Sequence, residues 1–149
     1  MIRTFSPDDA AEVTALWLES SARAHPFLPT GFTAHAEADM REVFLPLSDE
    51  VVLYVDDASG RIDAFMAFTG DFLGALFVRP SAQGRGIGGR MLRIALRMHP
   101  ELTLSVYRDN VRAVEFYRRH GLAVLGRRTE EASGCEELIM GRPPRGCNG

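Results

Sequence analysis

The apolar positions of the chain form two kinds of pattern: continuous runs typical of buried strands, and three- or four-residue spacings typical of helices. Strands are predicted at Met1–Phe5, Val51–Asp56, Ile62–Thr69, Leu73–Val78, Leu102–Val106, Leu122–Arg127 and Glu137–Met140. Helices are predicted from Ser6 to the break at His25-Pro26, from about Thr33 to Leu45, after the glycine-rich stretch 83–89, and from Asn110 to His120. The order βααβββαβαββ indicates one α/β or α+β domain over residues 1–141, with a flexible tail at residues 142–149.

One pair of neighbouring strands is expected to be parallel. Leu73–Val78 and Leu102–Val106 are separated by a single helix, and a strand–helix–strand unit places its two strands parallel in one sheet. The last two strands are separated by a short polar segment and are expected to form an antiparallel hairpin. The sheet should therefore be mixed.

Four glycines follow the strand Leu73–Val78 and open the next helix: Gly84, Gly86, Gly88 and Gly89. Without Cβ atoms, the backbone N–H groups of such a loop can approach phosphate oxygens, and the positive end of the helix dipole favours the same negative charge. The residues alone therefore predict a site for a phosphorylated ligand, although a flexible glycine-rich turn would have the same composition.

Two nucleotide-binding motifs fit this loop poorly. It lacks the Gly-Lys-Ser/Thr ending of a Walker motif. Gly84, Gly86 and Gly89 do match the dinucleotide pattern G-x-G-x-x-G, with Asp109 further along. However, the unit begins in the middle of the chain, and too few β-α repeats follow to build a doubly wound sheet.

A longer pattern is more specific. The loop 83–88 reads Gln-Gly-Arg-Gly-Ile-Gly and fits Q/R-x-x-G-x-G/A, and downstream the chain reads Asn110-x-x-Ala113-x-x-Phe116-Tyr117-x-x-x-Gly121-Leu122. Both blocks, in this element order, resemble the GNAT superfamily of N-acetyltransferases over essentially residues 1–141. The resemblance implies a GNAT fold, with a mixed central sheet and a splayed parallel strand pair, and the use of acetyl-CoA.

The resemblance also implies which residues hold the cofactor. One strand would pair its backbone with the pantetheine arm, the glycine loop would hold the pyrophosphate, and a helix-capping residue would hold the arm where the parallel strands separate. In that order the residues are Leu76, Phe77 and Val78; Gln83, Gly84, Arg85, Gly86, Ile87, Gly88 and Gly89; and Asn110. From the residues alone, Asn110 could be only a helix cap and Arg85 only a solvated loop residue.

The catalytic residue implied by the resemblance is Tyr117, which matches a tyrosine near the thioester sulfur that commonly serves as general acid. In this chemistry a neutral amine attacks the thioester carbon, a preset N–H stabilises the oxyanion, and a phenol protonates the departing thiolate. Tyr117 could instead be an aromatic that packs on the sheet, as its neighbour Phe116 is expected to do.

The acceptor site and the general base are less defined. Trp17, His25 and Phe27 lead into the connection between the first two helices, which in GNAT proteins usually overhangs the acceptor pocket. A core role for Trp17 and a turn role for His25 fit the residues equally well. In some GNAT proteins a glutamate on a central strand serves as the general base, but here Gly74, Ala75 and Ser105 occupy the corresponding positions. Asp71, His25, another side chain or a water chain would have to replace it, and no base is assigned.

Charge and cysteine content narrow the expected partners. Residues 1–71 hold four arginines and thirteen acids, a net charge of −9, whereas residues 72–149 hold thirteen arginines and seven acids, a net of +6. The second half thus suits an anion, while the total of −3 argues against nucleic acid. With only two cysteines, the chain is expected to be cytoplasmic. No apolar run is long enough to span a bilayer, so we expect a soluble protein that does not bind membranes. It is expected to be a monomer or a homodimer. The four histidines lack metal-ligand spacing, and no metal is expected.

The sequence therefore predicts an acetyl-CoA-dependent N-acetyltransferase that acts on a primary amine of a small molecule or peptide in a ternary complex. Two alternatives remain open at this stage. One is a noncatalytic module that binds or senses acyl-CoA, and the other is a nicotinamide-dinucleotide enzyme, which should prefer NAD to CoA.

Overall fold

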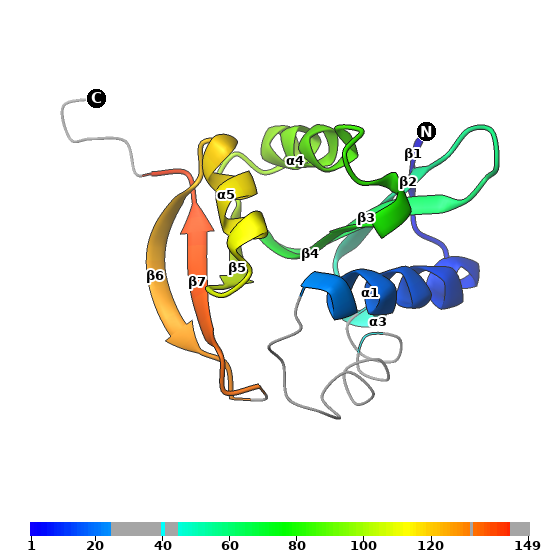
Figure 1. Ribbon diagram of the computed structural model, residues 1–149. Coiled ribbons are helices and arrows are strands. Elements are labelled where there is room, and N and C mark those ends of the chain that lie inside the picture. Colours follow the sequence, from blue (N-terminus) through cyan, green and yellow to red (C-terminus); the bar gives the residue numbers. More distant parts are fainter. Residues whose placement is uncertain (25–39, 41–44, 132, 144–149) are drawn as a thin grey trace.

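Seven strands form one mixed sheet in the computed structural model, which describes residues 1–24, 40, 45–131 and 133–143 (Figure 1). The strands are β1 (Ile2–Thr4), β2 (Glu50–Val55), β3 (Ile62–Thr69), β4 (Phe72–Val78), β5 (Thr103–Tyr107), β6 (Ala123–Thr129) and β7 (Glu136–Gly141). Their order in the sheet is β1-β2-β3-β4-β5-β7-β6. All seven predicted strands are confirmed, and their ends differ from the predicted ones by at most two residues.

The helices follow the predicted order where they are described. They are the short η1 (Pro7–Asp9), α1 (Ala10–Ala24), α3 (Leu45–Leu47), η3 (Pro80–Ala82), α4 (Ile87–Met98) and α5 (Val111–Arg119). The predicted helix over Thr33–Leu45 lies outside the described residues, apart from Met40 and Leu45, which are both buried. The β-strand β7 ends at Gly141, where the predicted domain ends, and most of the predicted tail lies outside the described residues.

The local signals at helix ends act as the sequence indicates. The Ser6 N–H donates to the Asp9 carboxylate at 2.9 Å, so that the first turn begins where the predicted cap lies. At α5 the Asn110 side chain accepts from the Ala113 N–H at 3.3 Å. Gly121 follows this helix with φ +89°, a conformation that suits glycine at a helix end.

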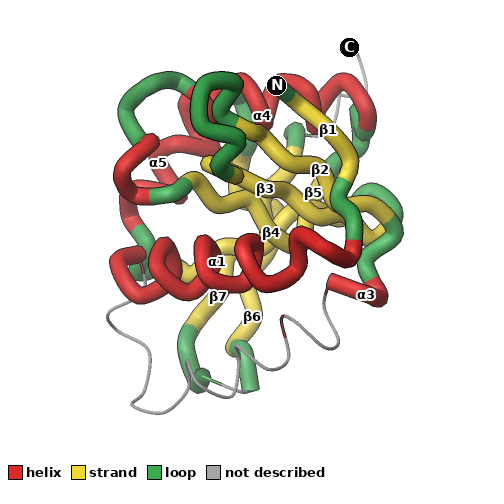
Figure 2. Tube along the Cα trace, turned by 90° about the vertical axis from the view of Figure 1, so that its right-hand side faces the viewer, coloured by secondary structure: helices red, strands yellow, loops and turns green. Residues whose placement is uncertain are grey.

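The helices divide between the two faces of the sheet, with α1 on one face and α4 and α5 on the other (Figures 1 and 2). Each face has its own apolar core. Under α4 and α5 the core includes Met91, Leu92 and Met66, and under α1 it includes Leu16 and Phe65. Because both faces are covered, β3 is buried along nearly its whole length and forms the centre of the molecule.

The predicted parallel pair is confirmed, but it is short. Strands β4 and β5 pair only at Phe72 with Thr103 and at Leu73 with Leu104. Directly after this point the register between β3 and β4 skips one residue, Gly74. A bulge of this kind bends the strand and increases its local twist. Beyond Gly74 the two parallel strands have no ladder between them.

Candidate functional site

A cavity of about 610 Å³ lies where β4 and β5 are no longer paired. Its described lining comes from the end of β4, the glycine loop with the first turn of α4, α5 with the two residues before it, and one residue of α1. In chain order these residues are Ser20, Leu76, Phe77, Val78, Gln83, Gly84, Gly86, Ile87, Gly88, Gly89, Asp109, Asn110, Val111, Arg112, Ala113, Phe116 and Tyr117. Ten of the eleven residues predicted to hold the cofactor are therefore brought together around one cavity, and only Arg85 is not part of its lining.

The glycines of the loop serve two different purposes. Gly84 and Gly86 have φ values of +84° and +80°, a left-handed conformation that side chains other than glycine rarely adopt. Gly88 and Gly89 instead allow close packing, since a Cβ on Gly89 would lie 3.0 Å from Nε2 of His120 and one on Gly88 would lie 3.4 Å from the Phe116 ring. The loop is thus turned by the first pair and held against α5 by the second.

The backbone of β4 presents one unpaired edge to the cavity. The Arg79 N–H donates to the Asp63 carbonyl of β3 at 2.7 Å, and successive residues of a strand direct their backbone groups to opposite edges. The N–H and C=O groups of Leu76 and Val78 therefore face the gap toward β5. Phe77 directs its backbone toward β3 instead, and its ring stacks on Phe65 with a centroid separation of 5.8 Å.

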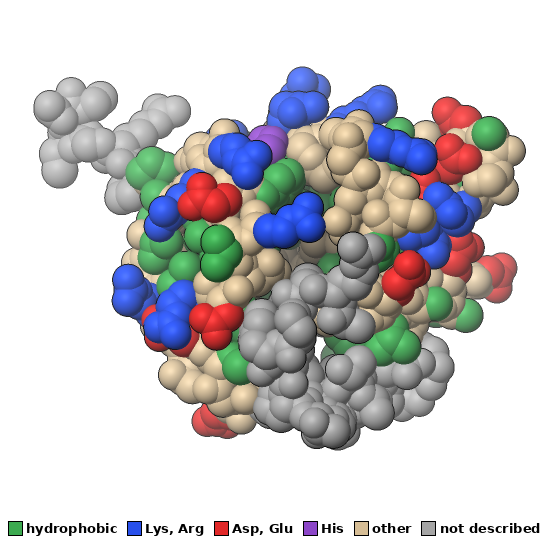
Figure 3. Space-filling view, viewed as in Figure 1, with side chains coloured by type: hydrophobic (Ala, Val, Ile, Leu, Met, Phe, Trp, Pro, Cys, Tyr) green, Lys and Arg blue, Asp and Glu red, His purple; other side chains and the backbone are tan. Residues whose placement is uncertain are grey.

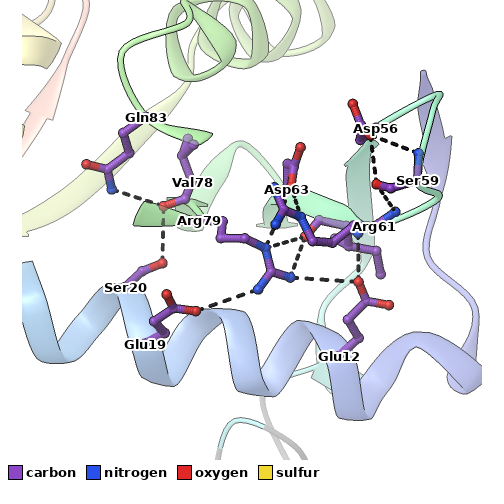
Figure 4. A network of polar contacts seen from close by, with 11 residues as sticks. Glu12, Glu19, Ser20, Asp56, Ser59, Arg61, Asp63, Val78, Arg79 and Gln83 are labelled. Carbon is purple, nitrogen blue, oxygen red and sulfur yellow. Dashed lines mark hydrogen bonds and ion pairs between the residues drawn. The ribbon is translucent and has the colours of Figure 1, made fainter. Parts of the chain in front are cut away.

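The last carbonyl of this edge, that of Val78, has two partners from within the chain (Figure 4). The Ser20 hydroxyl of α1 donates to it at 3.1 Å, and the Gln83 side-chain amide donates to it at 3.0 Å. A carbonyl oxygen has two lone pairs, so these donors occupy both of its acceptor positions. The groups of the edge that remain for a ligand are the Leu76 N–H, the Leu76 C=O and the Val78 N–H.

Tyr117 projects from α5 into the lining of the cavity and is 8% exposed. Burial raises the pKa of the Tyr117 phenol well above its ordinary value, because the charged phenolate is disfavoured away from water. The ring packs edge-on against Phe116, with ring centroids 5.2 Å apart. The side chain at this position is therefore a neutral phenol throughout the physiological pH range.

An ion-pair network joins α1 to the sheet beside the cavity (Figure 4). The Arg79 guanidinium donates to the Ile62 carbonyl at 2.7 Å. It also lies 3.6 Å from the Glu19 carboxylate and 3.7 Å from that of Glu12. Since Arg79 follows Val78 and Glu19 precedes Ser20, the network and the hydroxyl contact lie next to each other and hold the same two elements together.

Charge on the surface agrees with the division found in the sequence. Several basic side chains lie over α4 and α5 (Figures 1 and 3). Arg112, in the first turn of α5, also lines the cavity. These cations and the start of α4 make this end of the cavity suitable for an anion.

The residues predicted for the acceptor site are not brought to the cavity by the described part of the structure. Trp17 is 8% exposed and belongs to the apolar core under α1, which is the core role that the residues left open. His25 and Phe27 lie outside the described residues. Asp71, considered as a replacement base, bonds the His99 ring at 2.9 Å beside the paired end of β4, and it is not among the cavity residues.

Six residues of the lining are not among the predicted site residues: Ser20, Asp109, Val111, Arg112, Ala113 and Phe116. Ala113 and Phe116 belong to the motif given above, and Asp109 enters only through the dinucleotide pattern, whereas no sequence motif includes Ser20, Val111 or Arg112. Elsewhere, the described residues include no group of three or more His, Cys, Asp or Glu side chains that could bind a metal ion. Nor does any helix in the described ranges have the length and apolar character needed to span a membrane.

Comparison with known proteins shows which family the chain resembles. A family model described as "Acetyltransferase (GNAT) domain" matches residues 48–121. The peptidyl-lysine N-acetyltransferase YjaB of Escherichia coli (strain K12) is 35% identical over 127 residues, which cover 85% of this chain and 84% of the relative. The peptidyl-lysine N-acetyltransferase YiaC of the same organism is 29% identical over 144 residues, which cover 96% and 97%.

Solved structures share the fold. The solution structure of the apo form of YjaB from Escherichia coli has a TM-score of 0.85 at 29% identity and covers 95% of each chain. A PaiA N-acetyltransferase from Thermoplasma acidophilum, solved in complex with coenzyme A, has a TM-score of 0.73 at 17% identity and covers 97% of this chain and 98% of its own. The arrangement of seven strands and their helices is therefore that of these acetyltransferases.

Proposed function

The chain belongs to the GNAT superfamily and is an N-acetyltransferase, and from this premise we propose that it transfers an acetyl group from acetyl-CoA to the primary amine of a lysine side chain in a peptide or protein. The observation that carries the proposal is that a glycine loop, an unpaired strand edge and a buried tyrosine line the same cavity. The names of the two Escherichia coli relatives favour peptidyl lysine over a small-molecule amine.

The groups that line the cavity are chemically suited to successive parts of acetyl-CoA, which supports the proposal. The left-handed glycines and the start of α4 offer backbone N–H groups to a pyrophosphate at one end. The open edge of β4 offers one carbonyl and two N–H groups to the amides of a pantetheine arm. When bound, acetyl-CoA supplies an activated thioester, and the residues of the chain orient it.

Two groups can act on the charge that develops during transfer. An N–H group on the β4 edge, from Leu76 or Val78, is fixed in direction by the strand and can donate to the acetyl oxygen as it gains negative charge. Tyr117 remains protonated because of its raised pKa and can donate its proton to the leaving sulfur. Both groups come from elements that line the same cavity.

The structure also bears on how the acceptor loses its proton. Asp109 is the one carboxylate among the described cavity residues, and it is exposed and lies 3.6 Å from the Arg108 guanidinium at the loop end. We infer that the amine is taken up in its neutral form from solvent. The rate should then rise with pH toward the ordinary lysine pKa of about 10.4, and a plateau reached near pH 7 would instead indicate a base in the chain.

The proposal is tested first by ligand binding. Acetyl-CoA at about 100 times its Kd should add roughly 2.7 kcal/mol to the free energy of unfolding, whereas NAD at the same concentration should add nothing. For a chain of this size the expected rise in Tm is roughly 5–11 °C. A shift with NAD alone would overturn the proposal in favour of a dinucleotide enzyme.

Transfer is tested next with lysine-containing peptides and mass spectrometry. The 149 residues contain no lysine, so every acetyl-lysine detected must belong to the added acceptor. A peptide with lysine replaced by arginine is the matched control and should remain unmodified. Acetyl-CoA binding with no transfer to any peptide or small amine would indicate a noncatalytic binding module.

A further inference from the structure

Among the described residues, Ser20 is the one residue of α1 that lines the cavity. It is 4% exposed, and its hydroxyl donates to the Val78 carbonyl at 3.1 Å, a contact between positions 58 residues apart in the chain. All other described lining residues belong to β4, the glycine loop, α4, or α5 and the two residues before it. A helix on the opposite face of the sheet therefore reaches the cavity through a single polar side chain.

The contact lies where β4 has lost its neighbour. A carbonyl in the middle of a sheet is held by the next strand, but beyond Leu73 no ladder bond joins β4 to β5. The Ser20 hydroxyl and the Gln83 amide take the place of that missing strand at Val78. The direction of this carbonyl fixes the backbone at the end of the edge, and with it the N–H of Val78 and the groups of Leu76.

We propose that Ser20 is a positioning residue for acetyl-CoA: its hydroxyl holds the end of β4 in the orientation in which the open strand edge binds the pantetheine arm. The inference rests on the proposed use of acetyl-CoA. Ser20 acts through the strand, and it differs in this respect from the glycine loop, which would contact the pyrophosphate itself.

A neighbouring ion pair also holds α1 against the sheet, so the effect of Ser20 on ligand binding can be measured without losing the packing of α1. Arg79 lies 3.6 Å from Glu19 and remains to hold the helix against the sheet when the hydroxyl is removed. Gln83 remains as a donor to the Val78 carbonyl, so the carbonyl is not left without a partner. The Ser20→Ala protein should therefore fold, with a strand edge that is less well fixed.

The test compares two ligands that share one end. Acetyl-CoA carries the pantetheine arm, whereas adenosine 3′,5′-bisphosphate has the nucleotide but no arm. By isothermal titration calorimetry, Ser20→Ala should weaken acetyl-CoA binding about 3–10-fold, the range expected for one hydrogen bond, and leave the bisphosphate Kd within about twofold. In steady-state assays the KM for acetyl-CoA should rise while the KM for the acceptor is unchanged.

Thr14→Val is the matched control, because it removes another buried hydroxyl from the same helix. The Thr14 hydroxyl makes no hydrogen bond to any described residue, and Thr14 is not part of the described lining of the cavity. It should leave both ligand affinities unchanged. If Ser20→Ala unfolds, Ser20→Cys replaces the hydroxyl with a weak donor of similar size and should show the same selective loss.

Three outcomes are decisive. Equal weakening of both ligands by Ser20→Ala would overturn the proposal, because it would show a general effect on the fold. Unchanged binding of both would also overturn it. Failure of the unmodified protein to bind acetyl-CoA would contradict the proposed function itself, and this result is distinguishable because it does not depend on any variant.

Discussion

The two ends of β4 differ in almost every respect although they are only a few residues apart. At its start β4 pairs with β5, and the polar groups nearby bond to each other: the Asp71 carboxylate contacts the His99 ring at 2.9 Å. At its end β4 is no longer paired with β5, and its backbone faces a cavity. Gly74, the residue skipped by the register, separates the two ends.

The comparison shows how a sheet can be both a support and a binding surface. Backbone groups that are paired within the sheet stabilise the fold and are not available to a ligand. The short ladder at the start of β4 holds the strands in place, so the end can stay open without the sheet coming apart. Changes at the open end should therefore alter ligand binding or catalysis, and changes at the paired end should alter stability.

The largest effect is expected from Tyr117→Phe at the open end. This variant keeps the ring that packs in the core but removes the phenolic proton. If the phenol protonates the leaving sulfur, kcat should fall about 10²–10⁴-fold, with the Kd for acetyl-CoA within about twofold. Single-turnover assays and calorimetry measure the two quantities separately. An unchanged kcat would assign Tyr117 to packing alone.

The same burial determines how stability depends on pH. Because the pKa of Tyr117 is raised in the folded state, its neutral form contributes stability that is present below about pH 10, the ordinary tyrosine pKa, and is lost as pH rises above it. Denaturant titrations between pH 9 and 11 should show a steeper fall in the free energy of unfolding for the unmodified protein than for Tyr117→Phe. Parallel curves would contradict this assignment.

A second, smaller effect distinguishes two glycines that have the same backbone conformation. Gly86 in the loop and Gly60 in the turn between β2 and β3 have φ values of +80° and +74°, and a Cβ would meet no atom at either. Replacement by alanine should cost roughly 1–2 kcal/mol of stability at each site. Only Gly86→Ala should also weaken acetyl-CoA binding, by about tenfold for a loss near 1.4 kcal/mol. Equal affinities in the two variants would remove the loop from the binding site.

Much of the fold could be predicted because its signals are local. The Ser6-Pro7 start, the Asn110 cap and the glycine loop each depend on neighbouring residues, and all are found where the sequence indicates them. The apolar runs likewise predict the strands. The bulge at Gly74 could not be predicted, because it is a property of the pairing between β3 and β4 and not of either strand alone.

The site could be predicted less completely for the same reason. Ser20 is buried in α1, but its partner Val78 is distant in sequence, and nothing near Ser20 signals the contact. Trp17 shares that face and is core, since an apolar side chain on a buried helix face has the same pattern whether it packs or binds. Its assignment to the acceptor site remains without support from the described residues.

The fourth prediction concerns the paired end of β4. Asp71→Asn keeps a hydrogen bond acceptor near His99 but removes the carboxylate charge. Because the Asp71 side chain is 62% exposed, the loss should be below about 1 kcal/mol. The Tm should fall by no more than about 4 °C, and kcat and both KM values should stay within about twofold. A selective rise in the KM for acetyl-CoA would show that the two ends of β4 are coupled, and the division between them would not hold.

The smallest effect is expected from Thr14→Val in α1. The sign of the change in the free energy of unfolding is what this variant tests. The Thr14 hydroxyl is buried and has no hydrogen-bond partner among the described residues, which is unfavourable because the group has lost its contact with water. Valine has nearly the same shape and no polar atom, so the free energy of unfolding should rise by about 1 kcal/mol and the Tm by roughly 2–4 °C. Differential scanning calorimetry can resolve this change.

Ser20 is buried on the same helix but has a partner, so Ser20→Ala should lower stability where Thr14→Val raises it. If both variants lowered stability equally, the hydroxyl contact with Val78 would have no particular significance, and the link between α1 and the open end of β4 would depend on the Arg79 ion pairs alone.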